Sequence, residues 1–179
     1  MERETTFERF QNSVDDDRES VNLMGETMGK YEEGIANQLP FWASLKTEKL
    51  ETNERKGYVR NFTKYFSNEN VVNTIGKYEK MFGYQFAENL TMRLSIILKN
   101  SPEKVLETVK KIGSENVVNT IGKYDQENRM MILNCFFDAT KHNLEETSKT
   151  VEALGNNNVI KTIEKYEEEG NLLGSRLCD

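Results

Sequence analysis

Apolar residues recur every three or four positions along most of the chain, which is the spacing that lets an α-helix bury one face. The stretch 69–82 shows this pattern most clearly. Its apolar face consists of Val71, Val72, Ile75, Tyr78 and Phe82. Gly83 breaks the pattern, and the same periodicity then predicts helices over about 84–99 and 102–112. This part of the chain is therefore expected to form three consecutive helices.

The rest of the chain follows the same plan, and no segment has the alternation of a convincing β-strand. Helices are predicted near 3–13, 19–36, 39–50, 53–66, 115–126, 128–141 and 157–169. Pro40 is the second residue of the 39–50 helix. One more helix begins after Asn143, which forms a capping box with Glu146, and runs to Leu154. The sequence therefore predicts an all-α protein.

One segment of the chain is repeated almost unchanged. Residues 69–78 have the sequence ENVVNTIGKY, which recurs without a change at 115–124. A third copy is found at 157–166 and a weaker fourth at 22–31. The tyrosines that end the copies are 47, 46 and 42 residues apart. Repeats of about 20–50 residues are typical of architectures in which each unit buries its apolar face against the next.

The repeat divides the chain into units of three helices. The units span about 19–66, 67–113 and 114–155, with a C-terminal half-unit at 156–179, all within a single domain, 1–179. In its period and number of helices the chain resembles the armadillo and HEAT class of α-solenoids. This resemblance implies a helical-repeat fold with an extended binding surface. A compact multi-helix bundle made of the same helices is the alternative.

The polar side of the repeated helix carries a second pattern. Asn70, Asn73 and Lys77 are spaced i, i+3 and i+7, so they share a stripe opposite the apolar face. With the equivalent positions they form a candidate partner-binding strip: Asn70, Asn73, Lys77, Asn116, Asn119, Lys123, Asn158, Lys161 and Lys165. Asparagine side chains both donate and accept hydrogen bonds, which suits a peptide backbone. The resemblance to armadillo proteins implies an asparagine ladder of this sort, although theirs lies on a different helix.

Structural explanations compete with a binding strip. Recent duplication preserves surface residues that have no role, but residues 79–100 and 125–146 share almost nothing in register, so the units have diverged elsewhere. Asn70 and Asn116 are also placed to assist the first turn of their helices, and Lys77 is compatible with ordinary surface. The strip is therefore either a binding surface or a remnant of duplication and capping.

Other positions of the repeat are expected to serve the fold. Trp42 is expected to be buried, and so are three equivalent isoleucines: Ile75, Ile121 and Ile163. The tyrosine of each Lys-Tyr pair belongs to the apolar face, with its hydroxyl at the edge of the core and in need of a partner. Glycine occupies one helical position in three of the copies: Gly29, Gly76 and Gly122. Glycine costs about 1 kcal/mol there relative to alanine, and we expect the close approach of a neighbouring helix to compensate.

Composition and charge narrow the chemistry. The net charge is −6, and an acidic chain disfavours nucleic acid, which requires clustered Lys and Arg. Most of this acid excess lies in residues 1–20, where the Asp15–Asp17 run is either a metal or partner site or a solvated loop that favours the start of the next helix. The single histidine, His142, and two cysteines without metal-like spacing predict no metal site and no structural disulfide.

These observations favour a non-enzymatic interaction module or adaptor that binds an extended polar partner, a protein or an acidic peptide, along the strip. No cofactor is expected, because the sequence has no nucleophile motif, phosphate loop or dinucleotide fingerprint. The alternatives are a small-ligand-binding or enzymatic helical protein with a pocket between helices, and a nucleic-acid binder. Self-association stays open. Residues 1–20 lack an apolar secretory region, so no membrane contact and a cytoplasmic location are expected.

Overall fold

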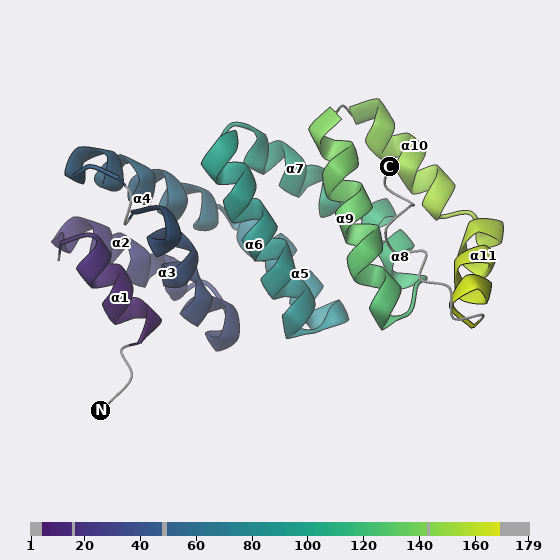
Figure 1. Ribbon diagram of the computed structural model, residues 1–179, viewed down its shortest axis with the longest axis horizontal. Helices are drawn as coiled ribbons and strands as arrows, with labels where there is room; N and C mark the ends of the chain where they lie inside the picture. Colours follow the sequence, from purple (N-terminus) through teal and green to yellow (C-terminus); the bar gives the residue numbers. More distant parts are fainter. Residues whose placement is uncertain (1–4, 16, 48–49, 143, 169–179) are drawn as a thin grey trace. The chain divides into compact units, whose positions relative to one another are not determined.

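The computed structural model describes residues 5–15, 17–47, 50–142 and 144–168 (Figure 1). These residues form helices α1 to α11 and no β-strand, so the predicted all-α class is confirmed for them. The helices are α1 (Thr6–Ser13), α2 (Arg18–Met28), α3 (Glu33–Thr47), α4 (Thr52–Phe66), α5 (Glu69–Phe82), α6 (Tyr84–Asn100), α7 (Lys104–Ile112), α8 (Glu115–Gly122), α9 (Gln126–His142), α10 (Leu144–Leu154) and α11 (Asn157–Glu168). The chain separates into two compact units, 1–106 and 107–179, whose boundary falls within α7.

The first unit is built from α1 to α6 and the start of α7 (Figure 1). Helix α1 packs on α3, α2 packs on both α3 and α4, and α6 packs on both α3 and α5. Aromatic rings fill much of the interior, as the ring centroids of Phe62 and Phe66 lie 4.5 Å apart. The largest fully buried side chains of this unit are Phe10, Met24, Ile35, Leu39, Phe62, Phe66, Ile75, Tyr78, Leu90 and Leu94. The apolar stripe of each helix thus meets the stripe of a neighbour.

The second unit comprises the rest of α7 and helices α8 to α11. Helix α10 packs on α8 and α9, and α11 packs on α10. The buried apolar side chains of this unit include Val109, Ile112, Val117, Ile121, Tyr124, Ile132, Leu133, Phe136, Phe137, Leu154, Ile160 and Ile163. The copy of the repeated segment at 115–124 therefore buries Val117, Ile121 and Tyr124, the equivalents of Val71, Ile75 and Tyr78 in the copy at 69–78.

The expected core positions of the repeat are confirmed. Ile75, Ile121 and Ile163 expose 0%, 0% and 2% of their surface, and Trp42 exposes 6%. The helical pattern misplaces a few other apolar residues, because Leu45 and Leu106 lie on the exposed sides of α3 and α7. The presence of leucine alone does not show which side of a helix packs against a neighbour. The residues directly before these two leucines, Ser44 and Val105, are buried instead.

The first helices differ most from the prediction. The expected helix 19–36 is interrupted after Met28, and α3 begins at Glu33 instead of residue 39. Pro40 therefore lies inside α3, where its ring and missing N–H disfavour a helix. Four buried side chains continue the helical spacing across it: Ile35, Leu39, Trp42 and Ala43. Their burial outweighs the local cost of the proline.

Two glycines mark the ends of helices. Gly83 separates α5 from α6 as predicted and has a φ of +91°, a conformation that glycine adopts without a steric penalty. Helix α8 ends at Gly122, although the periodicity predicts a helix to residue 126. The capping box predicted at Asn143 lies outside the described residues, because Asn143 is not among them.

Two further findings concern the surroundings of the chain. Among the described residues, none of the helices is both long and apolar enough to cross a membrane. Cys135 is buried in α9 and is disulfide-bonded, which corrects the expectation of no structural disulfide. Spacing along a sequence does not show which sulfur atoms the fold brings together.

Candidate partner-binding faces

The repeated segment contributes its apolar residues to the core in both units. In α5 the ring of Tyr78 stacks on that of Phe86, with centroids 5.5 Å apart and planes 3° from parallel. In α8, Val117, Val118 and Ile121 are buried. Burial accounts for the identity of these positions between the two copies without reference to a partner.

The end of the segment has a structural role in the first unit. Lys30 donates from Nζ to the carbonyl oxygen of Ser67 at 3.0 Å, and Tyr31 donates from its hydroxyl to the carbonyl of Phe66 at 2.5 Å. The hydroxyl groups of Thr27 and Ser67 lie 2.9 Å apart and share a hydrogen bond. Phe66 is the last residue of α4, so these bonds satisfy carbonyls that the helix itself leaves without donors. We call Thr27, Lys30 and Tyr31 the clamp of the first unit.

The second unit repeats the lysine and tyrosine bonds of this clamp at the equivalent positions. Lys123 donates to the carbonyl of Gly155 at 3.0 Å, and the buried Tyr124 donates to the carbonyl of Leu154 at 2.5 Å. Leu154 is the last residue of α10, as Phe66 is of α4. A cation at the C-terminal end of a helix also interacts favourably with the helix dipole. The tyrosine hydroxyls of these two copies therefore find their partners at the ends of α4 and α10, the third helices of the repeat units 19–66 and 114–155.

Burial shapes the ionisation of the clamp tyrosine. Desolvation raises the pKa of Tyr31 far above its ordinary value of 10.0, so its hydroxyl remains a hydrogen-bond donor at any physiological pH. The repeat alone signals that Lys-Tyr matters, but it does not reveal the acceptor. The acceptors are main-chain carbonyls, which every residue has, so only the fold shows that those of Ser67 and Gly155 are the ones used.

The predicted strip residues lie on the surface. Eight of the nine are exposed: Asn70, Asn73, Asn116, Asn119, Lys123, Asn158, Lys161 and Lys165. Lys77 is half-buried. Helix α5 carries Asn70, Asn73 and Lys77 in the first unit. In the second unit α8 carries Asn116 and Asn119, Lys123 is the C-cap of α8, and α11 carries the other three. Lys123 combines two roles, because it belongs both to the predicted strip and to the clamp.

The asparagines are not the caps of their helices. The N-cap of α5 is Asn68, whose side chain accepts from the backbone N–H of Asn70 at 3.0 Å. In α11 the side chain of Asn156 accepts from the N–H of Asn158 at 2.8 Å. Within the part of the chain that the structure describes, no hydrogen bond involves the side chain of Asn73 or Asn119. The exposed amides of these two residues are therefore identical in both copies and have no hydrogen-bond partner among the described residues.

The glycine of the repeat has no packing role in α5. A Cβ added to Gly76 meets no atom within 4 Å, so the expected close approach of a neighbouring helix is wrong at this position. Gly29 meets only backbone oxygens of its own helix, at 3.6 and 3.7 Å. Gly29 and Gly122 stand where α2 and α8 end, which suits a residue that weakens helices.

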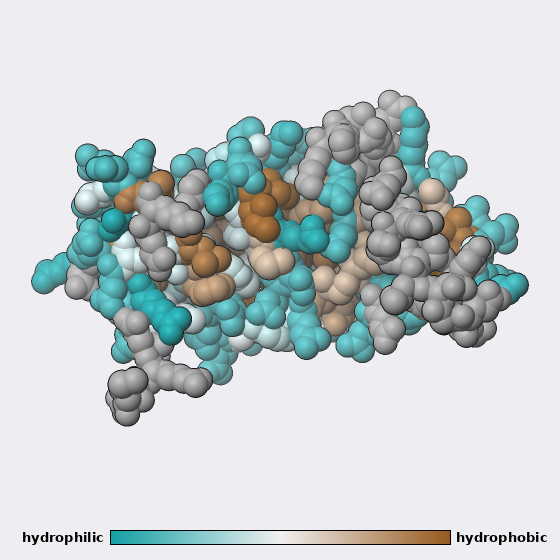
Figure 2. Space-filling model, viewed as in Figure 1, coloured by the Kyte–Doolittle hydropathy of each residue, from teal (hydrophilic) through white to brown (hydrophobic). Residues whose placement is uncertain are grey.

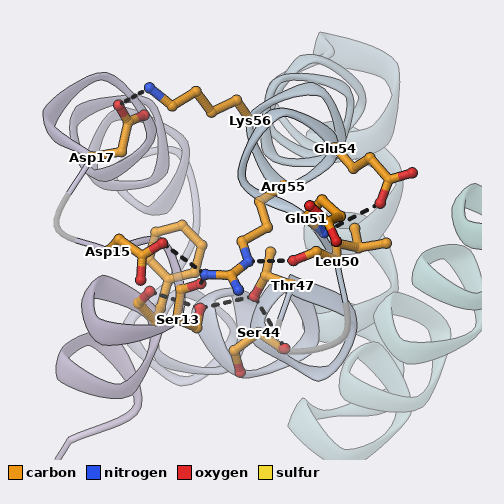
Figure 3. A network of polar contacts seen from close by, with 11 residues as sticks. Ser13, Asp15, Asp17, Ser44, Thr47, Leu50, Glu51, Glu54, Arg55 and Lys56 are labelled. Carbon is orange, nitrogen blue, oxygen red and sulfur yellow. Dashed lines mark hydrogen bonds and ion pairs between the residues drawn. The ribbon is translucent and has the colours of Figure 1, made fainter.

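The acidic run near the N-terminus is part of a structural network (Figure 3). Asp17 caps α2 by accepting from the N–H of Ser20, and it pairs with Lys56 of α4 at 2.8 Å. Asp15 pairs with Arg55 at 2.9 Å. The ion pair with Lys56, followed by the bond from Ser20, lowers the pKa of Asp17 to about 2. The described carboxylates of this run therefore join the α1–α2 connection to α4, as opposed to forming a ligand site; Asp16 lies outside the described residues.

Arg55 is a residue of this network that sequence analysis misses. Its guanidinium donates to the carbonyl oxygens of Leu50 and Ser13, at 2.6 and 3.2 Å, in addition to its pair with Asp15 (Figure 3). The buried hydroxyls of Ser13 and Thr47 share a bond at 2.8 Å beside it. Arg55 thus holds the ends of α1 and of the α3–α4 connection together.

Exposed apolar side chains gather on one part of the first unit. Figure 2 shows apolar surface over α3 and α6, among polar surroundings. Phe41 and Leu45 of α3 expose 38% and 55%, and Met92 and Ile96 of α6 expose 36% and 50%. Exposed apolar clusters of this kind mark places of contact in many proteins.

Comparison with known proteins adds no relative: the chain matches no protein-family model, no curated protein and no solved structure. Among the described residues, no group of three or more His, Cys, Asp and Glu side chains is arranged to hold a metal ion. His142 is the last residue of α9, as predicted. The internal repeat therefore supplies the observations that bear on function.

Proposed function

We propose that the protein is a non-enzymatic interaction module that binds an extended polar partner through the Asn/Lys faces of α5, α8 and α11. One observation carries the proposal: the side chains of Asn73 and Asn119 are exposed, identical and without a hydrogen bond in the described structure. Core packing accounts for Val71, Ile75 and Tyr78 and their equivalents, and the clamp accounts for Lys123 and Tyr124. A role outside the fold explains why these two amides persist in units that have diverged elsewhere.

The chemistry of the faces specifies the partner. An asparagine amide donates and accepts at the same time, so it pairs with the C=O and N–H of an extended main chain. Exposed lysines stand beside the asparagines on α11, at Lys161 and Lys165, and Lys77 lies half-buried beside Asn73 on α5. Cationic groups favour an acidic partner and speed its association at low salt. An acidic protein segment in an extended conformation satisfies both requirements.

We also propose that the units stack as a helical-repeat solenoid. Equal positions on equal helices of successive units then face the same way, which would bring the faces of α5, α8 and α11 into one strip. The support is the repeat period together with the same clamp at the end of the third helix in both units. Small-angle X-ray scattering tests this arrangement, because a solenoid has a larger maximum dimension than a bundle of equal mass.

The function is tested by replacing four strip asparagines, Asn70, Asn73, Asn116 and Asn119, with alanine together. Exposed substitutions of this kind change stability by about 0.5 kcal/mol or less each, so the variant is expected to remain folded. Affinity capture from cell extract, read out by quantitative mass spectrometry, is expected to lose the partners that the wild type retains.

A matched control replaces four other exposed asparagines: Asn22, Asn53, Asn61 and Asn100. The control is expected to capture the same partners as the wild type. Equal capture by the strip variant and the control would refute the proposal. A salt-sensitive gel shift with single-stranded nucleic acid that requires the strip would instead favour a nucleic-acid binder.

A further inference from the structure

Each clamp holds the junction at which the next repeated helix begins. In the first unit the clamp acceptors Phe66 and Ser67 directly precede Asn68, the N-cap of α5. Asn68 accepts from the N–H of Asn70 through its side chain at 3.0 Å and from the N–H of Val72 through its carbonyl at 3.0 Å. The clamp therefore fixes the residues that start the helix carrying Asn70, Asn73 and Lys77.

The second unit repeats this arrangement. The clamp acceptors Leu154 and Gly155 directly precede Asn156, which accepts from the N–H of Asn158 at 2.8 Å and from the N–H of Ile160 at 3.1 Å. Helix α11, which begins there, carries Asn158, Lys161 and Lys165. Two units with different third helices thus use the same contacts at the same junction.

We propose that Lys30 and Tyr31 are positioning residues for the exposed face of α5, and that Lys123 and Tyr124 are positioning residues for that of α11. The lysine supplies a charged donor to a carbonyl at the C-terminal end of a helix, where the helix has no donor of its own and its dipole is negative. Without this donor the last turn opens locally, and the N-cap that follows it loses its fixed place. The functional importance of these exposed faces rests on the proposed function. The effect of the clamp on the start of α5 and α11 does not depend on any partner.

Amide hydrogen exchange followed by NMR tests the inference in the first unit. Three amides report on the junction: Ser67, which bonds to the carbonyl of Thr63, Asn68, which bonds to that of Tyr65, and Asn70. In the Lys30→Met variant their exchange is expected to be roughly five- to tenfold faster, in keeping with the loss of one hydrogen bond of ordinary strength at an exposed site. The amide of Leu94, in the core of the same unit, is expected to keep its wild-type rate.

Two control variants separate the hydrogen bond from charge alone. Lys64 lies in the last turn of α4 and is exposed, so Lys64→Met removes a charge near the same helix end without removing the clamp. This variant is expected to leave the amide of Asn70 near its wild-type rate. Lys30→Arg keeps a cationic donor and is expected to restore most of the protection.

Equal exchange rates of the junction amides in Lys30→Met and Lys64→Met would overturn the inference. If Lys30→Met does not fold, Lys123→Met provides the test at the amides of Asn156 and Asn158 in the second unit. Faster exchange at the junctions together with an unchanged strip-variant capture refutes only the proposed function. Unchanged exchange together with lost capture refutes only the positioning.

Discussion

The hydroxyl of Tyr124 donates to the carbonyl oxygen of Leu154, 30 positions further along the chain. Tyr31 makes the same bond to Phe66 across 35 positions. The two acceptors belong to third helices of different sequence, so the contact is a property of the repeat and not of one local environment. The repeated segment therefore contains a tyrosine that bonds to the end of another helix, together with exposed asparagines, Asn73 and Asn119, that have no hydrogen bond in the described part of the chain.

The clamp predicts the effect of removing one hydroxyl. Tyr124→Phe is expected to lower the free energy of unfolding by about 1–3 kcal/mol, because it leaves the carbonyl of Leu154 without its donor beside a buried ring. Urea denaturation measures this loss. Tyr65→Phe, on a half-buried ring of α4, serves as the control and is expected to change stability much less. Equal losses in the two variants would mean that the clamp hydrogen bond contributes nothing specific.

The buried face predicts a larger effect. Ile121→Ala is expected to cost about 2–5 kcal/mol, the usual range for deleting this much of a fully buried side chain. Leu45→Ala removes a comparable side chain that is 55% exposed and is expected to cost about 0.5 kcal/mol or less. Both values follow from denaturation midpoints. A small loss for Ile121→Ala would place this residue outside the core.

Two glycines are expected to respond in opposite directions to alanine. Gly76→Ala should raise stability by about 0.5–1 kcal/mol, because a Cβ there meets open space inside a helix. Gly34→Ala should lower stability, because its Cβ would lie 2.6 Å from the ring of Tyr84 and force that ring to move. Thermal melting of the two variants measures the signs. A destabilising Gly76→Ala would contradict the open space around this position.

The ion pair of Asp17 predicts a dependence of stability on pH. Its folded-state pKa of about 2 is below the ordinary value of 3.8, so the folded chain binds the proton more weakly than the unfolded chain. The resulting stabilisation is present above about pH 4 and is lost as the pH falls toward 2. Asp17→Asn should therefore flatten the acid limb of a plot of melting temperature against pH. Parallel curves for the wild type and the variant would contradict this role.

Much of the fold is accessible from the sequence, because its helices are strongly periodic. The range 69–82 is predicted to the residue, since Gly83 ends one stripe of apolar residues before the next begins. The break between Met28 and Glu33 and the continuation of α3 through Pro40 are harder to predict. Both depend on which side chains pack against neighbouring helices. Local propensity does not contain that information.

The candidate faces are predicted in part for a similar reason. Exposure of Asn73 and Asn119 follows from the helical wheel, and both lie on the surface. The second role of Lys123 does not follow, because the carbonyl of Gly155 reaches it only through the tertiary packing of α10 on α8. In the sequence, a lysine opposite an apolar face cannot be distinguished from an ordinary exposed lysine, because the position of the neighbouring helix end is not known.

The affinity of a captured partner for the Asn73→Ala, Asn119→Ala double variant tests the central claim most directly. The variant is expected to have the same denaturation midpoint as the wild type. Titration calorimetry is expected to give a dissociation constant at least roughly tenfold larger than that of the wild type, because paired hydrogen bonds at the interface are lost. An unchanged dissociation constant would show that these asparagines do not bind the partner. A lowered denaturation midpoint would show instead that they belong to the fold.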